Sequence, residues 1–254
     1  MRVSDVLTLL GASAVGGAMN ALAGGGTLLT FPTLLLLGVP AIRANATSTV
    51  ALLPGAASSL AGYREDVATH RAWFRVLFWP SLLGGATGSL LLLATPERVF
   101  ARLAPWLVLF ATLLFIGQTI AAERRRGAEA AAHEPGSRAV AWLCQLAVAI
   151  YGGYFGAGIG ILMLAVLGYL GLSDIHAMNG LKNFFGICIN GVAAILFILR
   201  GVVDWRLAGI MLVGAIAGGY AGARFGRWIG KRWARFAVIL IGLGITLALL
   251  TQKS

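Results

Sequence analysis

The chain has 254 residues, of which 59% are hydrophobic, 11% are charged and 35 are glycine. Its mean hydropathy is +0.86. Soluble domains carry about 25% charged residues, so this composition excludes one and is typical of a polytopic membrane protein. A net charge of +11 would suggest nucleic acid in a soluble protein. Here the basic residues lie between hydrophobic runs, where they set orientation and meet lipid headgroups, and we expect membrane lipids and no nucleic acid as partners.

Uncharged runs predict the membrane-embedded helices, because about 20 apolar residues span ~30 Å of hydrocarbon. We expect the first run to be a retained span and not a cleaved signal peptide, since only Arg2 precedes it as a basic residue. The second run of each half is too short to cross comfortably and predicts a re-entrant or broken helix. In chain order the runs cover residues 6–23, 27–39, 44–62, 76–94, 103–122, 139–155, 159–172, 177–199, 207–223 and 236–250.

One charged stretch separates the two sets of runs. Residues 123–138 carry seven of the charged side chains in sixteen positions and predict an aqueous linker. The chain is therefore divided into a first transmembrane repeat, residues 1–122, the linker, and a second transmembrane repeat, residues 139–254.

Three landmarks recur in the same order in the two halves. The glycines at 24–26, with Gly38 after them, match residues 156–158 and Gly171; residues 63–73 match residues 197–207; and the glycine-rich segment 84–88 matches 218–222. This order predicts an internal duplication, as many transporters have, although chance likeness between glycine-rich helices stays open. Each half makes an odd number of crossings, which inverts the second. We expect an all-α fold of two inverted repeats, each with a glycine-linked short or re-entrant helix pair and three transmembrane helices.

The basic residues predict the orientation of the chain. Thirteen of the 20 Lys and Arg side chains fall on the side that holds the linker. By the positive-inside rule the linker is then cytoplasmic and both termini are periplasmic.

Polar side chains inside the apolar runs are costly in hydrocarbon unless they pair or line water. They form one patch in each half, beside a glycine turn. Glycine lets backbone approach a ligand, and a helix that starts after the turn offers N–H groups and a positive dipole end. Two such ends at a repeat interface predict an anion site. The predicted substrate-binding residues are Asn20, Gly25, Gly26, Thr47, Ser48, Thr49, Gly156, Gly158, Asn179, Lys182 and Asn183, with Asn190 two turns further on.

Plainer roles for these residues stay open. The glycines would also permit close helix packing, and the hydroxyls of Thr47, Ser48 and Thr49 could bond carbonyls of their own helix. Lys182 could extend to the headgroups. Serine-hydrolase, zinc-protease and ATP-binding motifs are absent from the sequence, so we expect no enzyme, no cofactor and no metal, and transport that is passive or driven by a gradient.

Several segments resemble the conserved blocks of the sulfite exporter TauE/SafE family. The first block is similar to residues 23–32 (AGGGTLLTFP) and 44–49 (ANATST). The second is similar to residues 152–160 (GGYFGAGIG), 177–183 (AMNGLKN) and 203–206 (VDWR). The likeness extends over roughly residues 6 to 250, and departs from the usual pattern at Ala157 and Phe31.

This resemblance implies a multi-pass permease of the bacterial inner membrane that moves sulfur-containing anions such as sulfite, thiosulfate or organosulfonates. The leading hypothesis is a secondary transporter that alternates access by movement of one repeat against the other. A channel-like anion pore and a membrane subunit without transport activity are the alternatives. A homodimer is compatible with the sequence.

Overall fold

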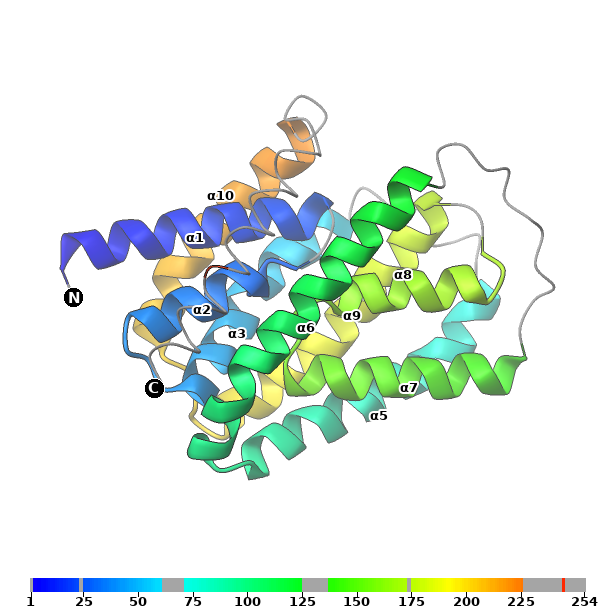
Figure 1. Ribbon diagram of the computed structural model, residues 1–254, viewed down its shortest axis with the longest axis horizontal. Helices are drawn as coiled ribbons and strands as arrows, with labels where there is room; N and C mark the ends of the chain where they lie inside the picture. Colours follow the sequence, from blue (N-terminus) through cyan, green and yellow to red (C-terminus); the bar gives the residue numbers. More distant parts are fainter. Residues whose placement is uncertain are drawn as a thin grey trace.

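The computed structural model describes residues 2–22, 25–60, 71–124, 137–172, 175–225 and 244. Within these ranges the chain forms helices and no strand (Figure 1), so the predicted all-α class is confirmed. The helices are α1 (Val3–Leu22), α2 (Thr27–Leu36), α3 (Ala41–Leu60), α5 (Arg71–Ala94), α6 (Glu97–Arg124), α7 (Arg138–Tyr154), α8 (Ile159–Tyr169), α9 (Ile175–Leu199) and α10 (Trp205–Phe225).

The first nine predicted apolar runs each coincide with one of these helices. The tenth, residues 236–250, lies outside the described residues. Around the predicted linker, α6 continues to Arg124 and α7 begins at Arg138, so helix extends into both ends of that stretch. Residues 125–136 lie outside the described part of the chain.

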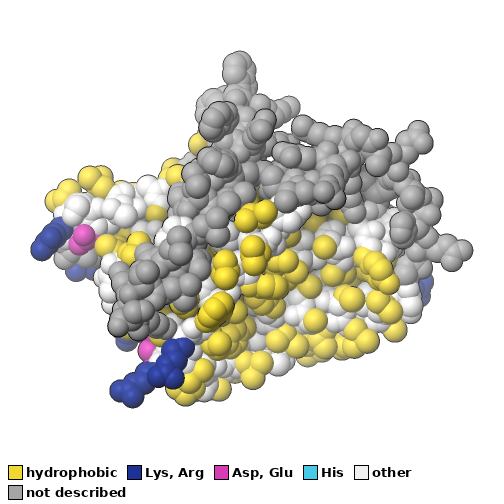
Figure 2. Space-filling view, viewed as in Figure 1, with side chains coloured by type: hydrophobic (Ala, Val, Ile, Leu, Met, Phe, Trp, Pro, Cys, Tyr) yellow, Lys and Arg dark blue, Asp and Glu magenta, His cyan; other side chains and the backbone are white. Residues whose placement is uncertain are grey.

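Three helical segments are long and apolar enough to cross a membrane, by length and composition, among the described residues: Trp73–Ala94, Glu97–Gly117 and Ala177–Leu199. Less than half of each segment is buried inside the protein. Large apolar side chains such as Trp79 and Trp106 are exposed. Hydrophobic side chains also cover much of the face in Figure 2, over α6 and α7, while Lys and Arg lie at its edges. A surface of this kind is stable in lipid and not in water.

Helices α2 and α8 are short, with 10 and 11 residues. At 1.5 Å per residue they are about 15–17 Å long, half of the hydrocarbon thickness. Both end in a Schellman motif with glycine at positive φ, Gly38 (79°) and Gly171 (88°). In each motif the next residue donates its N–H to the carbonyl five positions earlier, at 3.1 Å.

The most intimate packing joins α1 to α10. Gly214, Gly218 and Gly222 are spaced by four residues and form one stripe along α10, which faces α1. A Cβ atom at these positions would lie 2.1, 1.8 and 2.7 Å from atoms of α1. The two helices therefore touch through backbone, as small-residue stripes allow in membranes.

Helices α5 and α7 pack in the same way. A Cβ atom at Gly84 would lie 2.5 Å from the Cβ of Ala149, and one at Gly88 would lie 2.0 Å from the carbonyl oxygen of Ile150. A buried hydrogen bond from Gln145 Nε2 to Ser81 Oγ (2.8 Å) adds a polar link between the two helices. Helix α3 packs on α10 and α1, helix α9 packs on α5 and α7, and α3 and α9 contact each other.

Candidate functional site

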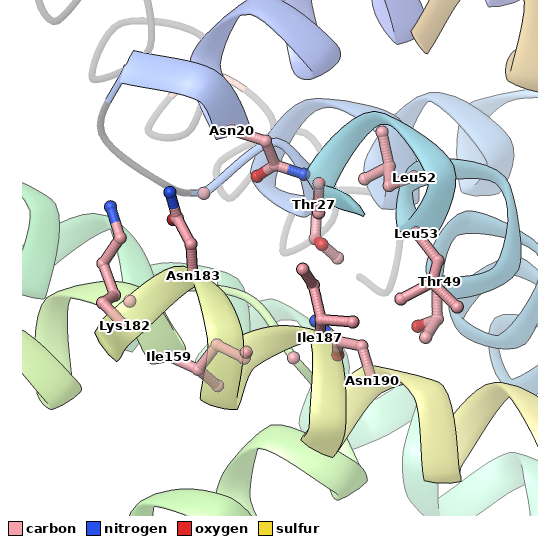
Figure 3. A pocket seen from close by; sticks show the side chains of 15 residues that line it. Asn20, Thr27, Thr49, Leu52, Leu53, Ile159, Lys182, Asn183, Ile187 and Asn190 are labelled. Atoms are coloured by element: carbon pink, nitrogen blue, oxygen red, sulfur yellow. The ribbon is translucent and has the colours of Figure 1, made fainter. Parts of the chain in front are cut away.

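A cavity of about 70 Å³ lies where α3 meets α9, beside Gly25 ahead of α2 and Gly156 ahead of α8 (Figure 3). Helix α3 contributes one wall and α9 the opposite wall. The described residues that line the cavity are Asn20, Gly25, Thr27, Thr49, Leu52, Leu53, Ala56, Gly156, Ile159, Gly160, Lys182, Asn183, Gly186, Ile187 and Asn190.

The N-termini of both short helices face this cavity. Thr27 is the first residue of α2 and Ile159 the first residue of α8, and both line it. Gly158 precedes α8 with a left-handed backbone, φ 80°, which glycine adopts without strain. The first N–H groups of a helix have no partner within the helix and carry its partial positive charge, so the cavity receives two electropositive ends.

Lys182 is the one ionisable side chain among the described lining residues. The residue is only 4% exposed. Its Nζ donates to Asn179 Oδ1 at 3.2 Å, one turn earlier on α9. Its stem runs along the first turn of α8, because a Cβ atom on Gly160 would lie 3.2 Å from Lys182 Cδ. The lysine is thus held beside a helix N-terminus, where the helix dipole does not stabilise its positive charge.

In the described part of the chain, three carboxylates accept hydrogen bonds away from the cavity. Asp5 accepts from the N–H of Arg2. Glu97 accepts from the N–H groups at the start of α3, and Asp204 accepts from the N–H of Leu207 in the first turn of α10. Each of these acids stabilises the start of a helix, and the described lining of the cavity contains no acidic residue.

Asn20 has a fixed orientation. Its Oδ1 accepts from the N–H of Gly26 at 2.8 Å. A Cβ atom on Gly26 would lie 2.3 Å from the carbonyl oxygen of Gly16, so Gly26 packs directly against α1. Since the amide oxygen of Asn20 is occupied by Gly26, its NH₂ group is the end left to donate to a ligand.

The predicted binding residues divide into two groups. Six of them line the cavity and the other five lie behind or beside it. The lining residues are Asn20, Gly25, Thr49, Gly156, Lys182 and Asn183, and the others are Gly26, Thr47, Ser48, Gly158 and Asn179.

Hydroxyls of the α3 patch connect helices to one another. Thr47 Oγ1 accepts from the N–H of Asp204 at 3.0 Å. Ser48 Oγ and Thr30 Oγ1 are 2.6 Å apart and buried. The hydroxyl of Thr49 donates to the carbonyl of Asn45 in its own helix, at 2.9 Å. The bonds of Thr47 and Ser48 position α3 against α10 and α2, and the Thr49 bond leaves oxygen lone pairs for other partners.

Sequence reasoning did not place several lining residues in the site. On α9 a signal for Gly186 was present, because it lies four residues from both Lys182 and Asn190, which places all three on one helix face. On α3 the lining residues Leu52, Leu53 and Ala56 are apolar like most of the helix, and no pattern separates them from residues that face lipid.

Comparison with known proteins shows that the chain is similar to membrane transporters. Residues 9–249 match the family model of the sulfite exporter TauE/SafE family. The chain belongs to this family, which is a family of membrane transporters and not of enzymes.

The chain is similar to a probable membrane transporter protein of Haemophilus influenzae, with 30% identity over 236 residues that cover 91% of this chain and 89% of the relative. It is 25% identical over 243 residues to the probable membrane transporter protein YfcA of Escherichia coli K12, covering 93% and 86%. It is 23% identical over 249 residues to the probable membrane transporter protein ORF9 of Sinorhizobium sp, covering 96% and 91%. No solved structure matches the chain.

Proposed function

We propose that this protein is a secondary transporter that binds a small sulfur-containing oxyanion, such as sulfite, thiosulfate or an organosulfonate, in the cavity between α3 and α9. One observation carries the proposal: Lys182 and the N-termini of α2 and α8 face a single cavity whose described lining has no acidic residue. An ammonium group beside two positive helix ends is electrostatically unfavourable in a low-dielectric site. A bound anion removes this cost and accepts hydrogen bonds from all three groups.

The name of the family, sulfite exporter TauE/SafE, supports a sulfur oxyanion over other anions. Sulfite and sulfonates present three oxygens around one centre. Such a group accepts donors from several directions at once, as Asn20, Lys182 and two helix N-termini supply them around the cavity. Efflux of an anion from a cell with a negative interior is favourable by ~2.3 kcal/mol per charge per 100 mV, so no coupling carboxylate is required.

We also propose that the fold is an inverted duplication. The matching glycines of segments 84–88 and 218–222 supply the two tight interfaces, α5 with α7 and α10 with α1. Both short helices end in the same glycine motif. They also run in opposite directions: α2 leads to the end of the molecule where Glu97 contacts Ala41, whereas α8 leads to the end where α6 stops and α7 begins (Figure 1). This arrangement supports two half-crossing hairpins that enter from opposite faces of the membrane.

The basic residues support the orientation expected from the sequence, with the linker in the cytoplasm and the termini in the periplasm of a bacterial inner membrane. Cysteine substitutions near residue 130 and near residue 4, probed from each side with a membrane-impermeant thiol reagent, test it. Labelling of the linker from the periplasm contradicts the proposal.

The transport proposal is tested by flux of ³⁵S-labelled sulfite, thiosulfate and an alkyl sulfonate into proteoliposomes of the purified protein. We expect saturable uptake of at least one anion, stimulated by the same anion on the opposite side. Lys182→Met keeps the apolar stem and removes the charge, and should weaken apparent affinity at least about tenfold. Arg200→Met is the matched control, because Arg200 is exposed and lies outside the cavity.

Two results contradict parts of this proposal. Flux that rises linearly with concentration and shows no counterflow identifies a channel-like pore. Unchanged affinity in Lys182→Met shows that the anion binds elsewhere.

A further inference from the structure

The packing divides the described helices into two groups that do not follow the two halves of the chain. One group, the α1 bundle, contains α1, α2, α3 and α10. The other, the α7 bundle, contains α5, α7, α8 and α9. The α1 bundle holds three helices from the first half of the chain and α10 from the second half. The α7 bundle holds three helices from the second half and α5 from the first half.

In each bundle, the helix that comes from the other half of the chain packs on its neighbours through backbone contact. In the α1 bundle, α10 touches α1 at Gly214, Gly218 and Gly222, and it touches α3 at Gly55, where a Cβ atom would lie 3.2 Å from the carbonyl oxygen of Ala215. In the α7 bundle, α5 touches α7 at Gly84 and Gly88 and touches α9 beside Gly85. A movement of one half against the other would open all of these contacts, whose close-packed atoms lose their dispersion attraction once they separate.

The glycine contacts of α5 and α10 each lie within one bundle, whereas the boundary between the bundles contains the cavity. The bundles meet where α3 contacts α9, and the cavity is lined on one side by Thr49 and Leu53 of α3 and on the other by Lys182 and Ile187 of α9. At one end they also meet through an edge-to-face contact of Phe31 and Phe155, with ring centroids 5.2 Å apart. Helix α6 contacts α2 and α3 of one bundle and α8 of the other.

We infer that the moving units of the transport cycle are the α1 bundle and the α7 bundle, and not the two sequence repeats. This inference rests on the proposed transport function. Each bundle carries one glycine turn and one wall of the cavity, so a shift of one bundle against the other exposes the anion to either side while the α1–α10 and α5–α7 contacts stay closed. Helix α6 lies over the boundary as a strap (Figure 1).

Dipolar EPR spectroscopy between spin labels tests the inference directly. Cys144 and Cys188 are first replaced by alanine, and labels are attached to cysteines at the exposed positions Val15 on α1, Leu83 on α5 and Val213 on α10. The pair 15–213 joins the two halves within one bundle, whereas the pair 15–83 joins the two bundles within one half. Spectra are compared with and without thiosulfate and between pH 6 and pH 8.

We expect the 15–213 distance to stay constant and the 15–83 distance to change. The inference is overturned if the 15–213 distance changes while the 15–83 distance does not. It is equally overturned if neither distance changes, because the bundles then form one rigid body. This readout requires no transport activity, so it decides the inference even where the flux experiment fails.

A disulfide between the halves gives a second test. A Cβ atom on Gly55 would lie 4.0 Å from the Cβ of Ala215, which is within the range that disulfides bridge. In the variant Gly55→Cys, Ala215→Cys, oxidation should leave at least about 70% of the flux of the reduced protein, since the bond forms inside the α1 bundle. Loss of flux on oxidation that dithiothreitol restores contradicts the inference, and the two single-cysteine variants control for direct effects of oxidation.

Discussion

Gly160 and Lys182 lie in contact across the α8–α9 packing, with the place of a glycine Cβ only 3.2 Å from Lys182 Cδ. The absence of a side chain at Gly160 is what lets the lysine stem follow the first turn of α8 into the cavity. The position of the one ionisable group among the described lining residues therefore depends on a residue that carries no functional group of its own.

Gly160→Ala should displace the lysine stem by a few tenths of an ångström and weaken anion affinity by about threefold to tenfold, since small misplacements of a binding group are costly. Isothermal titration calorimetry with thiosulfate measures the effect. Gly191→Ala on α9 is the control, because a Cβ there meets no atom within 4 Å. If the two variants bind the anion with equal affinity, Gly160 does not position Lys182.

The variant Asn20→Asp separates the role of the amide oxygen of Asn20 from the role of its NH₂ group. The carboxylate still accepts from the N–H of Gly26, whose bond to Asn20 Oδ1 measures 2.8 Å, and a negative charge is favoured at the N-terminus of α2. We expect unchanged or slightly higher thermal stability. The same substitution replaces a donor by a negative charge in the cavity and should weaken anion affinity by at least about tenfold.

The comparison for this variant is Asn20→Ala, which removes both ends and should lower both stability and affinity. An aspartate variant that binds the anion as tightly as the parent would show that the NH₂ group of Asn20 does not contact the ligand.

Gly218→Ala tests the α1–α10 contact. The added methyl group would lie 1.8 Å from the carbonyl oxygen of Ala14, so the helices must separate, and such overpacking costs about 1–3 kcal/mol. A lower midpoint of thermal unfolding in detergent is expected. Gly209→Ala on the same helix, where a Cβ meets nothing within 4 Å, should keep the parent midpoint or raise it, because alanine favours helix.

Ser48→Ala tests whether the α3 hydroxyls hold helices together or bind the anion. The variant loses the buried contact with Thr30 at 2.6 Å and should lower stability by about 1–2 kcal/mol. Because Ser48 is outside the cavity lining, anion affinity should stay within about twofold of the parent. Thr87→Val removes an exposed hydroxyl that bonds only its own helix, to Leu83 at 2.8 Å, and should change neither quantity. A large loss of affinity in Ser48→Ala with little loss of stability would show that Ser48 contacts the anion.

Much of the helical architecture could be predicted from sequence. Each apolar run within the described residues forms a helix, because lipid leaves backbone N–H and C=O groups no partner except within the helix itself. The two short elements were also predictable, since a run of 13 or 14 residues cannot span the hydrocarbon and each follows glycine. Helix ends were less predictable: α6 continues to Arg124, into the charged stretch, because glutamate and arginine are good helix formers.

The candidate site was predictable only in part. Lys182 and the glycine turns stand out in an apolar sequence, because a charge or a tight turn in hydrocarbon requires a reason. Thr47 and Thr49 have the same composition signal but different surroundings: one bonds Asp204 and the other lines the cavity. Their local sequence gives no means of separating these roles.

By itself, the sequence determined the membrane environment, the succession of helices and membership of a transporter family, since these depend on composition, run length and local motifs. Only the tertiary structure decided that α1 packs on α10 and α5 on α7, and which face of α3 lines the cavity. The physical reason is that nearly every face of these helices is apolar, so hydrophobic periodicity does not orient them. Their rotation and pairing are set by where backbones approach within contact, and this depends on helices that are far apart along the chain.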